Sequence, residues 1–136
     1  NDAHQCMDSR ALINNLASMI RAAQANKTIP IIGTIPPSFR NNPCADDIIA
    51  EANANIHSLA AGSNIVVAEI FDGMNNRDLF GISPDRDPLH PNEQGYRVMA
   101  DIWFQAMMQA TPGGLTAALR RRRRPRFAGS ASDRDA

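Results

Sequence analysis

Two short apolar runs, each preceded by a helical pattern, constrain the fold of this chain more than any other feature. The first run, residues 28–35, is rich in isoleucine and stops at Pro36-Pro37, and the second covers residues 65–71. A strand with one face in water alternates apolar and polar residues, whereas these runs are largely apolar at consecutive positions. We therefore expect two strands buried on both faces, as in a parallel sheet.

Three segments have the 3.6-residue apolar period of amphipathic helices, namely residues 8–25, 46–61 and 97–110. Asp8 and Ser9 are candidate caps of the first helix, and Gly62 is expected to end the second. Alternation of helices and strands, with a long loop at 72–86, implies right-handed crossovers. A parallel sheet needs neighbouring strands on both of its edges, and two strands alone cannot supply them. We therefore expect the second half of a flavodoxin-like, doubly wound α/β fold.

The segment Asp87-Pro88-Leu89-His90-Pro91 brings a carboxylate and an imidazole together before the last helix. Asp followed by Pro favours a type I turn, which places its first and fourth α-carbons within about 7 Å, so Asp87 can reach His90. Pro91 suits the first helical position and favours an extended conformation at His90. Such a pair suits a general base whose cation the carboxylate stabilises.

The alternative for this segment is purely structural, because a turn opener and a helix cap use the same residue types. Asp85 is a rival carboxylate, but it lies outside the four-residue turn. The residues that follow favour the catalytic interpretation.

The pattern Asp-x-x-His-Pro-Asn, with Gly95 and an amphipathic helix after it, resembles the last conserved block of the SGNH, or GDSL-type, hydrolases. That resemblance implies a three-layer α/β/α fold and a Ser-His-Asp triad, with His90 as base and Asp87 as orienting acid. The first two residues match the end of the Gly-x-Asn-Asp turn of this family. The resemblance thereby implies that Asn1 helps to form the oxyanion hole.

The nucleophile of that family is a serine in a Gly-Asp-Ser turn, and no serine of this sequence stands in such a context. We therefore interpret the chain as the C-terminal portion of a serine esterase whose serine lies upstream, and expect these residues to be inactive alone. The full-length protein would cleave carboxylic esters of small molecules or carbohydrates without a cofactor. The alternative is a non-catalytic binding domain on the same fold, and the upstream sequence would decide between them.

The remaining histidines indicate no metal site, because His4 and His57 form no ligand cluster with other residues. His57 lies within a predicted helix and is expected at the surface. His4 follows the predicted oxyanion turn and could line the rim of the site.

The two cysteines are candidates for a disulfide. In the fold that the resemblance implies, Cys6 and Cys44 both lie in loops beyond the carboxyl ends of neighbouring strands. A disulfide there would suit a secreted or extracytoplasmic protein, with a signal peptide outside this sequence. Two unpaired thiols in a cytosolic protein are the alternative.

The overall neutral charge conceals two different regions. Residues 1–112 carry a net charge of minus five and residues 113–136 one of plus five, with Arg120–Arg124 in a single run. We expect one domain over 1–112, no transmembrane segment, and a disordered tail over 113–136. A solvated tail is the simple interpretation, and contact with polyanions is the alternative. Specific nucleic-acid recognition is not expected, because aromatic residues are nearly absent from the tail.

Overall fold

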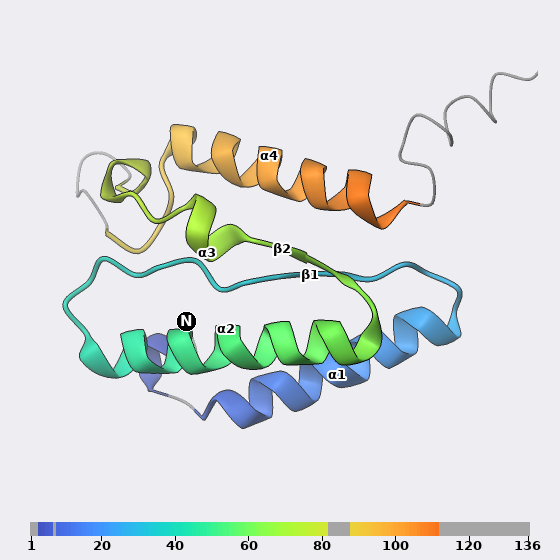
Figure 1. Ribbon diagram of the computed structural model, residues 1–136. Coiled ribbons are helices and arrows are strands. Elements are labelled where there is room, and N and C mark those ends of the chain that lie inside the picture. Colours follow the sequence, from blue (N-terminus) through green and yellow to red (C-terminus); the bar gives the residue numbers. More distant parts are fainter. Residues whose placement is uncertain (1–2, 7, 82–87, 112–136) are drawn as a thin grey trace, which may run out of the picture.

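The computed structural model describes residues 3–6, 8–81 and 88–111 (Figure 1). Its elements are the 3₁₀ turn η1 (Ala3–Gln5), α1 (Ser9–Ala25), β1 (Ile31–Gly33), α2 (Pro43–Ser63), β2 (Val66–Ala68), α3 (Ile70–Gly73), the 3₁₀ turn η2 (Arg77–Leu79) and α4 (Glu93–Ala110). The predicted tail, residues 113–136, lies outside the described residues, so the domain boundary at 112 stays a prediction.

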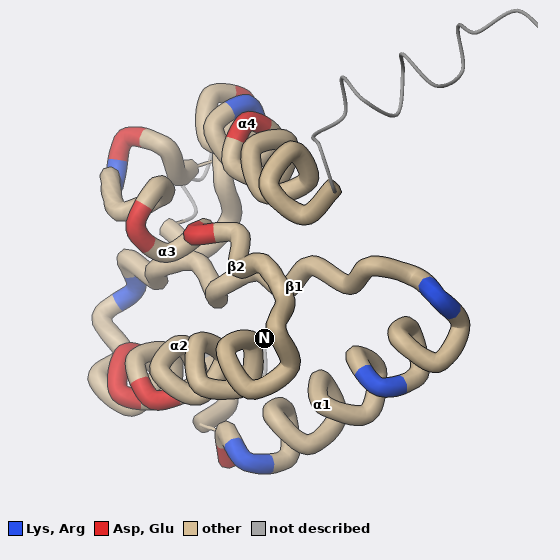
Figure 2. The backbone as a smooth tube through the Cα atoms, turned by 45° about the vertical axis from the view of Figure 1, so that its right-hand side comes forward, with Lys and Arg blue, Asp and Glu red and all other residues tan. Residues whose placement is uncertain are grey.

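The two strands form a parallel pair, with Ile31 opposite Val66 and Gly33 opposite Ala68. Helices α1 and α2 cover one face of this pair and α4 covers the other (Figure 1, Figure 2). One buried cluster lies beneath α1 and α2, and consists of Ile20, Ile32, Ile56 and Ala60. A second lies on the α4 side, and consists of Ala68, Ile70, Met74, Leu79, Phe80 and Ala106. The predicted three-layer α/β/α arrangement with a parallel sheet is thus confirmed.

Helix α1 begins where the sequence predicts. The Asp8 carboxylate caps it by accepting a hydrogen bond from the backbone N–H of Arg10, at 2.8 Å. This hydrogen bond holds the pKa of Asp8 below its usual value. Of the two candidate caps, Ser9 is instead the first helical residue and is buried.

Helix α2 is longer than predicted at both ends. It begins at Pro43, with the Asn42 side chain accepting a hydrogen bond from the N–H of Ala45. Proline suits this first position because its missing N–H would have no partner there. The prediction that Gly62 ends the helix is wrong, because Gly62 lies within α2 and Asn64 adopts the left-handed cap conformation, with φ 52°. Asparagine tolerates that conformation better than most residues.

Both strands are shorter than predicted. The first covers only Ile31–Gly33 of the expected 28–35, and the second ends at Ala68 because Ile70 already begins α3. Thr34, just beyond β1, fixes this change of direction. Its backbone N–H donates to the carbonyl of Ala68 at 3.0 Å, and its buried hydroxyl accepts from the N–H of Phe71 at 2.8 Å. The start of α3 is therefore fastened to the carboxyl end of β1.

Within the described ranges, no helix combines the length and the apolar composition that a membrane span requires.

Candidate active site

The segment that carries His90 is fastened on two sides. Pro91 pairs with Phe80 in an isolated antiparallel bridge, and the N–H of Gly81 donates to the carbonyl of His90 at 3.0 Å. On the other side, the N–H of Phe39 donates to the carbonyl of Pro88 at 3.3 Å. The His90 backbone is thus positioned by the loop after β1 as well as by the segment after η2.

Helix α4 begins at Glu93, two residues after Pro91, which corrects the prediction that Pro91 is its first residue. Asn92 is the N-cap, and its side-chain oxygen accepts from the N–H of Gly95 at 3.0 Å. The same amide donates to the carbonyl of Asp78 at 2.8 Å, so a single side chain joins α4 to η2. A Cβ at Gly95 would collide with the carbonyl oxygen of Leu79, which explains glycine at this position.

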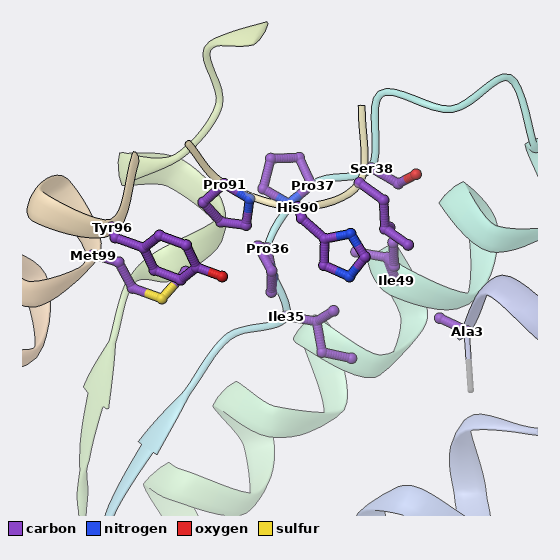
Figure 3. Close-up of a pocket in the computed structure, with 11 residues that line it drawn as sticks. Ala3, Ile35, Pro36, Pro37, Ser38, Ile49, His90, Pro91, Tyr96 and Met99 are labelled. Atoms are coloured by element: carbon purple, nitrogen blue, oxygen red, sulfur yellow. The ribbon is translucent and has the colours of Figure 1, made fainter. Parts of the chain in front are cut away.

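His90 faces a cavity of about 290 Å³ beyond the carboxyl end of β1. Figure 3 shows its imidazole directed between Ile35 and Ile49, while Tyr96 lies on the other side of Pro36. The lining is formed by Ala3, Ile35, Pro36, Pro37, Ser38, Ile49, Leu89, His90, Pro91, Tyr96 and Met99. Ligands of open α/β sheets bind outside the carboxyl ends of the strands, so the location fits a substrate site.

The part of the cavity wall that follows β1 is held in place by Asn53, a residue that the sequence did not single out. Its side chain accepts from the N–H of Ile35 at 2.7 Å and donates to the Ile35 carbonyl at 3.0 Å. Asn53 is only 8% exposed, on the inward face of α2. The sequence does contain a signal that could have identified Asn53: it is a polar residue at the helical spacing of Ile49 and Ile56, on the apolar stripe of a helix.

Cys6 and Cys44 form a disulfide, with their α-carbons 5.9 Å apart. That separation lies within the range of about 4.4–6.8 Å that native disulfides span. The bond joins the end of η1 to the first turn of α2, and Ala3 of η1 contributes to the cavity wall. The disulfide therefore connects part of the cavity wall to the main body of the domain.

The structure describes only some of the other predicted site residues. Asp87, its rival Asp85 and Asn1 lie outside the described residues, as does the side chain of His4. His57 is at the surface as predicted, where its side chain is half exposed and lies 3.5 Å from the Glu69 carboxylate. The described part of the chain contains no group of three or more His, Cys, Asp or Glu side chains that could hold a metal.

The three-layer arrangement, with a histidine at the carboxyl edge of the sheet, matches the fold of the α/β/α SGNH hydrolases. A sequence profile of the GDSL-like lipase/acylhydrolase family matches residues 1–98. The chain belongs to this family.

Solved structures of similar fold agree with that assignment. A member of the lipolytic protein G-D-S-L family from Veillonella parvula is 28% identical, with a TM-score of 0.65, and the match covers 77% of this chain and 57% of that one. A structure assigned to the SGNH hydrolases, from Slackia heliotrinireducens, is 22% identical, with a TM-score of 0.61 and coverage of 77% and 61%.

The esterase domain of the ORF1 protein of a zebrafish retrotransposon, ZfL2-1, is 17% identical, with a TM-score of 0.59 and coverage of 83% and 60%. This structure and the Slackia structure support the fold alone. The chain spans roughly three fifths of the length of each of the three structures. No curated protein sequence matched significantly.

Proposed function

We propose that this chain provides the base and the acid of a serine esterase. The observation that carries the proposal is His90, held by backbone contacts on two sides and directed into a cavity at the carboxyl edge of the sheet. Asp87 would orient the imidazole, and Asn1 would donate to the oxyanion. Membership of the GDSL-like family supports these roles.

The nucleophile in this proposal is a serine outside these 136 residues. Four of the five described serines, all except Ser63, have contacts or positions that support that choice. Ser18 and Ser58 donate to carbonyls one helical turn back, and Ser9 is buried. Ser38 lines the cavity, but its oxygen accepts from the N–H of Arg40, and Figure 3 shows its hydroxyl directed away from the His90 imidazole.

The proposed reaction proceeds in two halves. The serine oxygen attacks the ester carbonyl while His90 accepts the serine proton, and the oxyanion is stabilised by Asn1 and backbone N–H groups. When the carbon–oxygen bond to the alcohol breaks, His90 gives that proton to the leaving oxygen. Water then attacks the acyl-enzyme with His90 again as base, and the proton returns to the serine as the carboxylic acid leaves.

Ser38→Ala is the variant that separates this proposal from its nearest rival. In the full-length protein, we expect the variant to hydrolyse a short-chain aryl ester within about threefold of the wild-type rate, because Ser38 donates no proton to His90 in the proposed reaction. Release of the aryl alcohol, followed by absorbance, measures this. Loss of turnover by a folded Ser38→Ala protein would make Ser38 the nucleophile, and no turnover by the wild type would favour a binding domain.

The disulfide supports an oxidising location, and we propose that the protein is secreted or extracytoplasmic. Contact between the arginine-rich tail and polyanions stays a prediction from the sequence.

A further inference from the structure

A second cavity, of about 210 Å³, adjoins the cavity that His90 faces. The two share Pro37, Ser38 and Ile49 as lining residues. The second cavity also lies beyond the carboxyl ends of the strands, because Phe39 follows β1 and Phe71 follows β2. Both cavities therefore open on the edge of the sheet where ligands of such folds bind.

The lining of the second cavity becomes more polar from the inside outward. Its buried lining residues, Pro37 and Ile49, are apolar. Its half-buried lining residues include two aromatic rings, those of Phe39 and Phe71. Its exposed lining residues, Asp46 and Asn75, are polar. A site with an apolar interior and a few polar groups at its mouth suits a small organic molecule. The two rings would contact its apolar faces, and the polar groups would bind its edge.

Asp46 and Asn75 are available for that purpose. Among the described residues, neither side chain has a hydrogen-bonding or ion-pair partner. The carboxylate accepts hydrogen bonds, and the amide both donates and accepts. Since the lining contains a carboxylate but no lysine or arginine, it favours a neutral molecule with hydroxyl groups over an anion.

The second cavity is joined to the loop that carries His90 through the N–H of Phe39, which donates to the Pro88 carbonyl. In the proposed reaction, His90 protonates the leaving alcohol, so the alcohol portion of the ester lies on the His90 side of the scissile bond.

We propose that the second cavity binds the alcohol portion of the substrate, a neutral hydroxyl-bearing ring of pyranose size. This inference rests on the proposed esterase function and names its substrate class.

The test compares two acetate esters in the full-length protein: methyl β-xylopyranoside carrying a single acetyl group, and ethyl acetate, which has no ring. Asp46→Ala should lower kcat/KM for the sugar ester about tenfold, because a charge-assisted hydrogen bond is lost, and should leave ethyl acetate unchanged. Asp47→Ala is the matched control, since Asp47 is an exposed neighbour outside the cavity lining, and should change neither ester.

A second measurement does not depend on turnover. Saturation-transfer NMR with methyl β-xylopyranoside, the glycoside product, should detect binding to the wild type and to Asp47→Ala but not to Asp46→Ala. Thermal melting checks that each variant is folded, and Asn75→Ala serves if Asp46→Ala is not. Binding without turnover of either ester would refute the esterase while supporting the subsite. Equal effects on both esters, or unchanged glycoside binding in the folded variant, would overturn the subsite.

Discussion

Replacing His90 with alanine in the full-length protein should lower the turnover of a short-chain aryl ester at least about 1000-fold, because the serine loses the group that accepts its proton. The loss should appear in kcat, since His90 acts on the transition state and its removal leaves the apolar walls of the cavity in place. Asp87→Asn should lower kcat by a smaller factor, because the imidazole remains but loses the carboxylate that stabilises its cation. Steady-state kinetics measure both effects.

His57→Ala is the matched control for this experiment. His57 is a half-exposed histidine on α2 with its own carboxylate neighbour, Glu69, and it does not line the cavity. Its removal should leave ester turnover within about twofold of the wild type, as is usual for surface positions. Near-wild-type activity of a folded His90→Ala protein would remove His90 from the mechanism.

Of the proposed substitutions, those that break the disulfide should cause the largest loss of folding stability. Cys6→Ser or Cys44→Ser should lower the free energy of unfolding by about 2–5 kcal/mol, because the bond closes a loop between residues 38 positions apart and removing it gives the unfolded chain more freedom. Denaturant unfolding of the full-length protein, followed by circular dichroism, measures the change.

The two single variants and the double variant should lose equal stability, because each breaks the same bond. Wild-type protein reduced with a dithiol and alkylated should behave in the same way. A loss below about 0.5 kcal/mol, the scale of an ordinary surface substitution, would show that the bond adds little to the fold.

The fold could be predicted from the sequence because its helices and strands have different apolar periods. The isoleucine-rich run stopped by Pro36-Pro37 indicated a buried strand, and the inward stripe of residues 8–25 indicated a helix. Helix ends were less predictable, because they depend on single caps. Asn42 caps the start of α2 and Asn64 caps its end, whereas the sequence predicted a start near Asp46 and an end at Gly62. Both caps depend on local backbone geometry.

The site was only partly predictable, for a similar reason. His90 could be proposed as a site residue because its neighbours form a recognisable pattern. Asn53 could not, because its role is to bind the backbone of Ile35, and that contact joins residues 18 positions apart. The link from Phe39 to Pro88 is likewise a backbone contact between distant segments, which no side-chain pattern encodes.

Locating the reactive serine tests the esterase proposal most directly. The full-length protein is treated with an alkyl fluorophosphonate, which phosphonylates serines activated by a histidine base, and the labelled peptide is identified by mass spectrometry. The predicted result is one labelled serine outside these 136 residues, with labelling abolished by His90→Ala and retained by His57→Ala. A label on Ser38, or equal labelling with and without His90, would contradict the proposal.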